Sequence, residues 1–357
     1  MARRAPSINT GSMADISFLL LSFFLMVSSI NTEQGIPRRL PPPKDEKSTE
    51  QIIDINRRNV LSVLVNFNDE LLVNGEEIQI SQLKEKAMEF LENPTNSPNL
   101  PEKETKEINF LGDYPVSQGV ISLTNDQSTS YDMYVQVQNE LQKAVNELRD
   151  KLSSSYFGKK YENLDTAYQN SIQKAVPMNI SEAPPIDYNK TIVMSRFRKG
   201  EKKELPAINT GSMSDIIFMF LFFFITITNM RDATLKVTYT PPKATEVQKL
   251  EKKSLVASIY VGLPVGKNEN TLPPGKISVQ LNDQTIKQEE LVADVRDFVG
   301  TEKESRSEED KNKLTFSLKI DKSVQMRYVN IIKSELRKNN ALKINYAAGK
   351  IAETKKN

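Results

Sequence analysis

Two almost wholly apolar stretches interrupt a chain in which polar and apolar residues otherwise alternate at short intervals. Residues 16–30 contain 11 apolar residues out of 15, residues 216–228 contain 11 out of 13, and the others are Ser or Thr. Extended back past one Asp, Asn9–Ile30 and Asn209–Met230 are each 22 residues long. As helices these segments measure about 33 Å, enough to cross the ~30 Å hydrocarbon layer of a membrane. The pattern predicts two transmembrane helices.

Two other interpretations of these stretches are weaker. A helix buried in a globular core is one alternative, but large apolar side chains on every side suit lipid better than an amphipathic face would. A secretory signal would explain Arg3 and Arg4 before the first stretch. However, Asp15 adjoins its apolar region, no A-x-A cleavage pattern follows, and the same segment recurs deep inside the chain.

The chain repeats itself. Residues 6–18 read PSINTGSMADISF and residues 206–218 read PAINTGSMSDIIF, which are identical at 10 of 13 positions. A weaker repeat, SLxxDxS, occurs at residues 122–128 and again at residues 317–323. We therefore interpret the chain as two copies of one unit.

Each copy is expected to begin with a basic tail and a membrane helix, to continue through a Pro-rich extended spacer, and to end in a small α+β domain. The expected boundaries are 1–31 for the first tail and helix, 32–50 for the spacer, 51–193 for domain one, 194–230 for the second tail and helix, 231–253 for its spacer, and 254–357 for domain two.

Periodicity within the two domains predicts alternating strands and helices. In the first copy we expect strands at 60–66 and 120–124, a turn at Asn74-Gly75, and helices at 81–91, 131–152 and 161–175. In the second copy we expect strands at 254–261, 277–281, 314–320 and 342–346, and helices at 288–299 and 324–337. Loops are expected at 93–107, 263–276 and 301–313, which are rich in Pro, Asn, Glu and Lys.

Composition removes many kinds of chemistry. The 357 residues include no Cys, His or Trp. Disulfides, thiolate and histidine metal sites, and the Ser-His-Asp triad are therefore excluded. No Gly-rich phosphate loop is present, so no nucleotide or other cofactor is implied. A net charge of +2 gives no reason to expect nucleic-acid binding. The Asp and Ser residues of the two SLxxDxS repeats fall at strand ends, where they are ordinary turn formers.

Asp15 and Asp215 are the candidate functional residues, and two interpretations remain open. Ser12 and Ser212 each stand three residues before an Asp, as in a capping box that stabilises a helix N-terminus. Alternatively, each carboxyl lies one to two turns inside the hydrocarbon, where an ionisable group costs about 2.5–3.5 kcal/mol and is seldom kept without a function. Desolvation raises the pKa of a carboxyl, so such an Asp can exchange a proton near neutral pH where a polar partner or a water path reaches it. Neither helix supplies an opposite charge, which implies a second protein.

The same residues carry a family resemblance. After a short basic tail, each copy has a Pro-x-Ile-Asn element that includes Asn9 or Asn209, and an Asp that opens a helix of the form Asp-Ile-x-Phe-x-x-Leu-x-Phe-Phe. A Leu/Pro spacer and a small α+β domain follow. Each copy resembles ExbD of the ExbD/TolR family of biopolymer-transport proteins, and the likeness covers nearly the whole chain.

The resemblance implies a function. In the family the helix Asp takes and releases a proton, which carries over to Asp15 and Asp215. The implied assembly is an ExbD dimer within a ring of ExbB in the bacterial inner membrane, with periplasmic domains and with proton flux coupled to TonB and outer-membrane import. The hydrophobic-Asp-Leu-Pro element of many members is only partly kept, because residues 39–41 read RLP and residues 237–241 read VTYTP.

The charges around the helices raise a topological problem. Basic residues precede both helices, so the positive-inside rule places both N-terminal flanks in the cytoplasm. One chain with two crossings cannot satisfy this rule, and residues 45–193 contain no third apolar stretch. Residues 194–199, MSRFRK, look like the start of a second polypeptide. We therefore hypothesise that two adjacent reading frames are joined near Met194.

Other functions stay open at this stage. A TolR-like role in envelope maintenance uses the same proton machinery, and a flagellar or gliding stator is a more distant variant. A membrane-tethered structural adaptor would use Asp15 and Asp215 only as helix caps. No residue pattern supports an enzyme.

Overall fold

The computed structural model describes residues 18, 33–43, 56–182, 235–250, 255–265, 277–282, 284–286 and 288–351. From residue 34 onward these residues belong to one compact unit, which contains the domains of both copies. The two predicted membrane helices, 9–30 and 209–230, lie outside the described residues except for Phe18. Within the part that is described, no helix is both long and apolar enough to cross a membrane.

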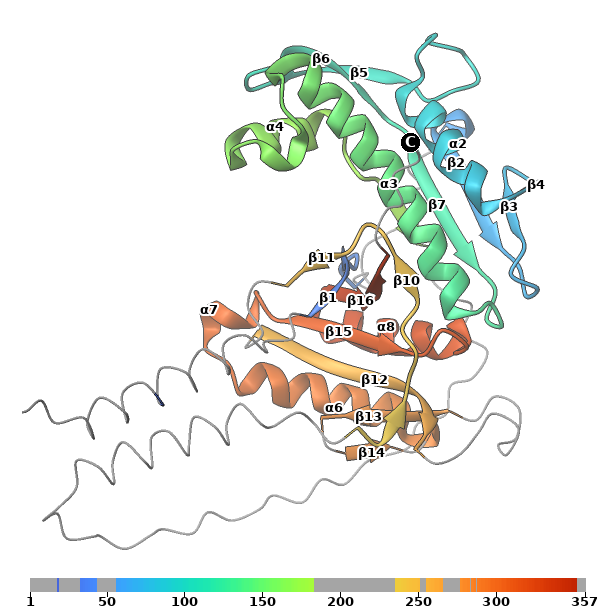
Figure 1. Ribbon diagram of the computed structural model, residues 1–357, viewed down its shortest axis with the longest axis vertical. Helices are drawn as coiled ribbons and strands as arrows, with labels where there is room; N and C mark the ends of the chain where they lie inside the picture. Colours follow the sequence, from blue (N-terminus) through green and yellow to red (C-terminus); the bar gives the residue numbers. More distant parts are fainter. Residues whose placement is uncertain are drawn as a thin grey trace, which may run out of the picture. The chain divides into compact units, whose positions relative to one another are not determined.

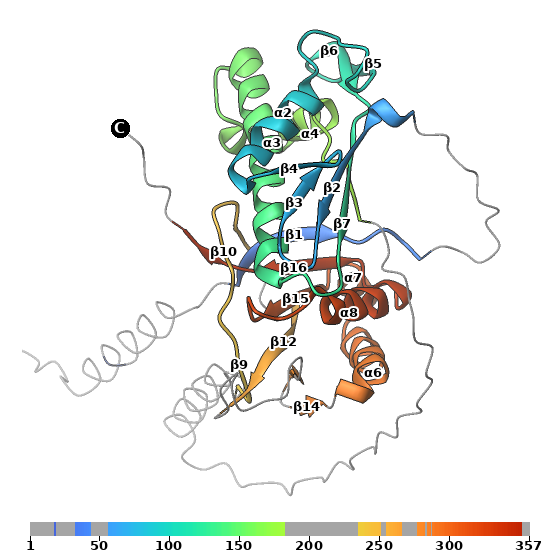
Figure 2. The ribbon, with the colours of Figure 1, turned by 90° about the vertical axis from the view of Figure 1, so that its right-hand side faces the viewer.

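The domain of the first copy is built on a five-stranded sheet with strand order β4-β3-β2-β7-β8. Its strands are β2 (Val60–Val65), β3 (Leu71–Val73), β4 (Glu76–Ile78), β7 (Val120–Asn125) and β8 (Ile180–Glu182). The predicted turn at Asn74-Gly75 joins β3 to β4, and both residues have positive φ angles, which a two-residue hairpin turn requires. Helices α2 (Ile80–Glu92) and α3 (Tyr131–Phe157) cover one face of the sheet (Figure 2).

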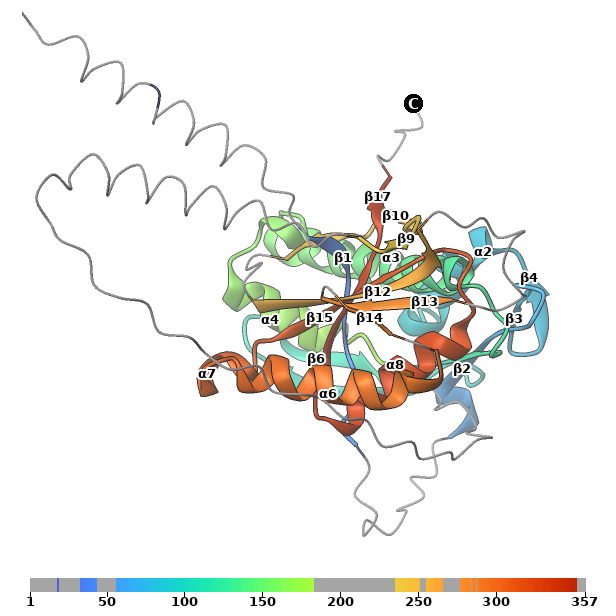
Figure 3. The same cartoon turned by 90° about the horizontal axis from the view of Figure 1, so that it is seen from below.

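The domain of the second copy repeats this topology. Its strands follow the order β14-β13-β12-β15-β16 within a larger sheet. They are β12 (Val256–Pro264), β13 (Ser278–Leu281), β14 (Gln284–Ile286), β15 (Thr315–Ile320) and β16 (Lys343–Ala347). Helices α6 (Leu291–Glu304) and α8 (Met326–Lys338) lie side by side on one face (Figure 3). The α+β class and every predicted strand are thereby confirmed.

The structure corrects several predicted loops and helix boundaries. The predicted loop 263–276 begins inside β12, which runs to Pro264. The predicted loop 93–107 contains the start of β5 (Lys103–Ile108), which pairs with β6 (Gly112–Ser117). The predicted loop 301–313 contains the end of α6 and a short helix α7 (Glu308–Lys311). The helix predicted to start at 161 is α4 (Thr166–Ala175), preceded by a separate turn, and the helix predicted to start at 288 is α6, which begins at Leu291. These segments look like loops in the sequence because the side chains on their water-facing sides are polar.

The first copy carries an extension that has no counterpart among the described residues of the second copy. Helix α3 continues to Phe157, and α4 and the β5-β6 hairpin pack against its last turns (Figure 1). They enclose a second small hydrophobic core, whose buried members include Ile108, Leu152 and Ile172. A cavity of about 500 Å³ opens beside it, lined in part by Leu91 and Tyr114.

The Pro-rich segment after the first membrane stretch is extended, as predicted, but it is a strand and not only a spacer. Strand β1 (Gln34–Arg39) pairs antiparallel with β16 of the second copy over five residue pairs. Ile36 is fully buried there, and the Leu40 amide donates to the Leu342 carbonyl at 2.7 Å. Residues 34–43, which we name the first crossing segment, therefore complete the sheet of the other copy.

Residues 235–250, the second crossing segment, contact both copies. Strands β9 (Val237–Thr238), β10 (Lys243–Ala244) and β11 (Gln248–Lys249) pair with β12, with β17 (Gly349–Lys350) and with β1, respectively. The amides of Thr245 and Glu246 both donate to Oδ1 of Asn139 on α3, at 3.0 and 2.9 Å. Each crossing segment therefore reaches the other copy.

The two SLxxDxS loops meet where α3 and α8 begin. Tyr131 donates its amide to the Val324 carbonyl, and Met326 donates to the Thr129 carbonyl, both at 2.8 Å. A second reciprocal pair runs from Asp132 to Lys322 and from Arg327 to Gln127. The partners in each pair of bonds are related by an offset of 195 residues, the spacing of the SLxxDxS repeat. The copies therefore face each other across an approximate two-fold axis.

Candidate functional site

The predicted site residues cannot be placed in this structure. Asp15 and Asp215, together with the motif residues Asn9, Ser12, Asn209 and Ser212, all lie outside the described residues. The two SLxxDxS motifs are described. Their carboxylates accept the amides of Ser128 and Ser323, at 2.8 and 2.9 Å, so each Asp closes a turn as expected. Asp321 also accepts the Thr240 amide of the second crossing segment at 2.6 Å.

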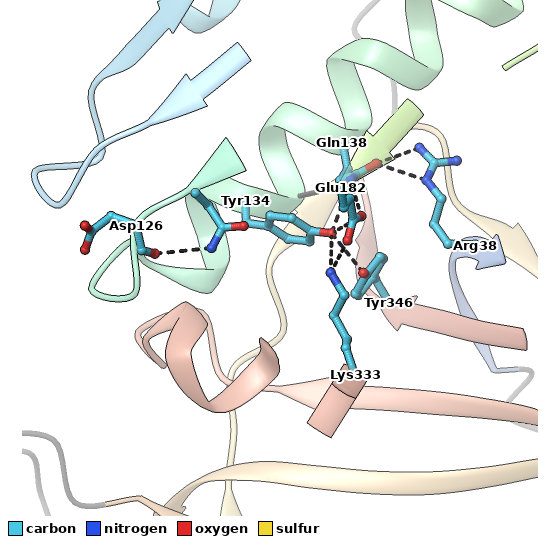
Figure 4. A network of polar contacts seen from close by, with 8 residues as sticks. Arg38, Asp126, Tyr134, Gln138, Glu182, Lys333 and Tyr346 are labelled. Atoms are coloured by element: carbon cyan, nitrogen blue, oxygen red, sulfur yellow. Dashed lines mark hydrogen bonds and ion pairs between the residues drawn. The ribbon is translucent and has the colours of Figure 1, made fainter. Parts of the chain in front are cut away.

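A cluster of buried polar side chains lies at the contact between the copies (Figure 4). We name it the polar cluster. The first copy contributes Arg38 from β1, Tyr134 and Gln138 from α3, and Glu182 from β8, and the second copy contributes Lys333 from α8 and Tyr346 from β16.

The central contact is an ion pair between the Lys333 ammonium and the Glu182 carboxylate. The exposed fractions of the two side chains are 11% and 22%, so water screens the pair weakly. Lys333 also lies 3.3 Å from the Tyr134 oxygen and packs against the rings of Tyr134 and Tyr346.

Neutral groups complete the hydrogen bonding of this pair. The Tyr134 hydroxyl donates to Glu182 at 2.6 Å, so its oxygen is left to accept, and Tyr346 lies 2.8 Å from it as the donor. Gln138 donates its amide to Glu182 at 3.1 Å, while its carbonyl accepts two bonds from the Arg38 guanidinium at 3.0 and 2.8 Å. A buried charge pair is stable only when its remaining lone pairs and protons are satisfied in this way.

Electrostatics keep both charges in place. Burial alone would raise the pKa of Glu182, but the Lys333 ammonium and the hydrogen bonds from Lys333 and Tyr134 outweigh burial and lower the pKa. Burial alone would lower the pKa of Lys333, but the Glu182 carboxylate raises it above its ordinary value. Burial and the neighbouring carboxylate raise the pKa of Tyr134, which therefore stays a neutral donor. The cluster is a saturated structural contact and presents no free nucleophile.

Sequence reasoning missed the polar cluster, although one signal was available. An offset of 195 residues aligns the SLxxDxS repeats, and carried into the helices it aligns Glu140-Leu141 with Glu335-Leu336 and Lys143 with Lys338. The same offset aligns Gln138 with Lys333. Aligning the two copies would therefore have shown that a neutral Gln138 stands where the other copy has a charged Lys333, on a helix whose neighbouring positions are alike.

Comparison with known families agrees with this repeat organisation. The family model for the biopolymer transport protein ExbD/TolR matches residues 1–149 and, a second time, residues 201–350. The chain belongs to the ExbD/TolR family. Each match joins one apolar stretch to the following α+β domain, so two ExbD/TolR units lie in tandem as the sequence resemblance indicated. No curated protein and no solved structure matches the chain. The ExbD/TolR family is a membrane-associated family of transport proteins.

Proposed function

We propose that this chain is the energy-transducing subunit of an inner-membrane complex of the ExbB-ExbD-TonB type. An ExbB-like ring would enclose the two membrane helices in the bilayer, and a TonB-like protein would be the periplasmic partner. Proton flux through the helix Asp would drive import across the outer membrane. Each proton supplies about 2.3 kcal/mol per 100 mV, enough to bias a conformational cycle without enzymatic chemistry.

The repeated Asp carries this proposal. Asp15 and Asp215 open the only two long apolar stretches of the sequence, within a motif that the copies share at 10 of 13 positions. The family model matches both copies, including these stretches. Two polar membrane positions kept alike in one chain support proton carriage at both, with Asn9, Ser12, Asn209 and Ser212 arranging the start of each helix.

The pairing of the domains supports a particular topology. The two domains contact each other through β1, the polar cluster and the SLxxDxS loops, which supports a position of both on the same side of the membrane. A continuous chain that crosses the bilayer twice would separate them. We infer that the copies act as two polypeptides, divided near Met194, with both domains in the periplasm.

Substitution of the Asp residues tests proton coupling. Asp15→Asn and Asp215→Asn, made singly and together in the native host, are expected to abolish uptake of iron or cobalamin complexes through the outer membrane. Asp126→Asn, which changes only a turn residue, is the matched control. Detergent sensitivity without an uptake defect would favour the TolR-like role. Normal uptake and normal detergent resistance in the double variant would favour the adaptor.

Cysteine labelling tests the topology, because the chain has no Cys of its own. Ser154→Cys and Ser307→Cys place single thiols at exposed positions, one in each domain. We expect a thiol reagent that cannot cross the inner membrane to label both variants, each on a band near half of the full mass. Labelling of the Ser154→Cys variant alone, on a full-length band of 40.5 kDa, would overturn the proposed topology.

A further inference from the structure

The two copies differ at structurally equivalent positions of the polar cluster. Gln138 of α3 and Lys333 of α8 are related by the 195-residue offset of the repeat. Glu182 pairs with Leu123 across β7-β8, and Tyr346 pairs with Leu318 across β15-β16. Because Leu123 and Leu318 occupy the same place in the SLxxDxS motif, Glu182 and Tyr346 are equivalent as well. The first copy therefore presents a carboxylate and an amide where the second presents an ammonium and a phenol.

The charges at these positions are complementary only when a first copy pairs with a second copy. In the observed pair, one ammonium faces one carboxylate. The approximate two-fold axis means that two first copies would bring two Glu182 carboxylates together with no Lys333 between them. Two second copies would bring two Lys333 ammonium groups together with no carboxylate. In a pair of first copies only Arg38 would remain as a cation near Glu182, and in a pair of second copies Lys333 would lack its carboxylate. Neither like pair keeps the Lys333–Glu182 ion pair, and loss of one partner of a buried pair is strongly unfavourable.

The backbone bonds between the SLxxDxS loops do not discriminate in the same way. The four bonds between the SLxxDxS loops join backbone amides to backbone carbonyls, and each copy supplies both kinds of group. A pair of like copies could form the same four bonds. Discrimination between unlike and like pairs must therefore come from the crossing segments, which differ between the copies, and from side chains. Among the described residues, the ion pair that joins the two copies is Lys333 with Glu182, and Arg38 of the first copy lies near the same carboxylate.

We propose that the polar cluster selects the unlike pair, so that the partner of each first-copy domain is a second-copy domain and not another first copy. This inference deepens the proposed function and rests on it for the dimer. It assigns Glu182 and Lys333 as the residues that determine partner choice. The choice requires a repulsive arrangement in the wrong pairs as well as an attractive one in the right pair.

Single Cys substitutions, one in each of the two polypeptides, measure the selection directly. Ser130 and Gln325 face each other in an isolated antiparallel bridge and are equivalent in the repeat. When the two polypeptides, divided near Met194, are expressed together, Cys at 130 of one and at 325 of the other can form a 130–325 disulfide in an unlike pair, or 130–130 and 325–325 disulfides in like pairs. Oxidation in membranes, proteolysis and mass spectrometry of the linked peptides give the three products in one sample. We expect the 130–325 product to predominate.

Neutral substitutions in this background give opposite results. Glu182→Gln removes the repulsion between first copies and is expected to raise the 130–130 product, whereas Lys333→Gln is expected to raise the 325–325 product. Each is expected to lower the ratio of unlike to like product on the order of 100-fold, since one buried charge loses its partner. With both substitutions, total cross-linking should recover while selection stays lost.

The control and the contrary results are clear. Lys84→Gln and Glu147→Gln break a more exposed ion pair within the first copy and should leave the ratio unchanged. Equal amounts of the three products in the parent chain would overturn the proposal. So would equal ratios in the parent and in both neutral variants. Adding Asp15→Asn and Asp215→Asn should not alter the ratio, so failure of proton coupling and failure of partner selection are separate results.

Discussion

The two crossing segments perform related tasks with different structures. The first crossing segment inserts one continuous strand into the sheet of the second copy and buries Ile36 there. The second makes three two-residue pairings and reaches the first copy through β11, which pairs with β1, and through backbone amides bound to Asn139. The difference shows that one copy depends on the other for a strand, whereas the reverse contact is a set of local hydrogen bonds.

The polar cluster lies beside the first crossing segment. Acid should therefore weaken the contact at the first crossing segment more than the contact at the second. Glu182 faces Lys333, Arg38, Tyr134 and Tyr346. Because its pKa is lowered, its contribution is present above the unfolded value of about 4.3 and is lost as pH falls through the folded pKa. Because the pKa of Lys333 is raised, its contribution is present below about 10.4 and is lost as pH rises through the folded pKa.

We therefore expect the pairing of the copies to be strongest between these limits and to weaken in acid by about 3–5 kcal/mol, because protonated Glu182 leaves Lys333 unpaired. The 130–325 cross-link, followed against pH under equilibrium redox conditions, measures this change. Glu182→Gln should pair more weakly at neutral pH, and its cross-linking should fall less as the pH is lowered. If cross-linking in Glu182→Gln falls in acid as much as in the parent, other carboxyls cause the effect.

Truncation of buried residues compares the two crossing segments directly. Ile36→Ala should destabilise the unit by about 2–5 kcal/mol, because a fully buried side chain in β1 leaves a cavity beside β16. Val237→Ala is the matched change, since Val237 is 1% exposed but lies in β9 against its own copy. Both variants should lose unfolding free energy in urea, whereas only Ile36→Ala should reduce the 130–325 cross-link. A comparable reduction in Val237→Ala would place both segments in the pairing.

Much of this fold could be predicted from sequence, for an identifiable reason. Strands such as Val60–Val65 and Thr315–Ile320 alternate or run apolar over short lengths, and a local pattern suffices to recognise them. Strand β1 could not be recognised as a sheet strand, because its partner Lys343–Ala347 lies about 300 residues away and Pro37 is unusual inside a sheet. Its extended conformation was predictable; its pairing was not.

The candidate sites also differ in how far sequence alone predicts them. A repeated acid on an apolar stretch stands out in the sequence, so Asp15 and Asp215 can be predicted without coordinates, and they remain a prediction. Lys333 and Glu182 are ordinary charged residues in polar segments, and only the fold brings them together. Their identity as a pair depends on two elements of different copies, which periodicity within either copy does not report.

Steric crowding provides a finer test of how closely the first crossing segment approaches the second copy. A Cβ at Gly35 would meet the backbone oxygen of Tyr346 and the side chain of Asn345. Gly35→Ala should therefore push β1 away from β16 and cost about 1–3 kcal/mol, as overpacking does elsewhere. Urea unfolding and the 130–325 cross-link should both report the loss. Unchanged cross-linking would mean that β1 can shift without weakening the pairing.

The smallest effect should have the opposite sign. Gly300 lies inside α6, and a Cβ added there would meet nothing within 4 Å. Gly300→Ala should stabilise the second copy by about 0.5–1 kcal/mol, because Ala loses less backbone entropy than Gly in a helix. Urea unfolding should show the gain while the 130–325 cross-link and the like products stay at their parent ratio. Gly35→Ala and Gly300→Ala are the same chemical change. The first should weaken the pairing of the two copies, and the second should change only the stability of the second copy, so comparing them separates the two effects. A changed ratio in Gly300→Ala would show that pairing follows the stability of the domain and not the complementarity of its face.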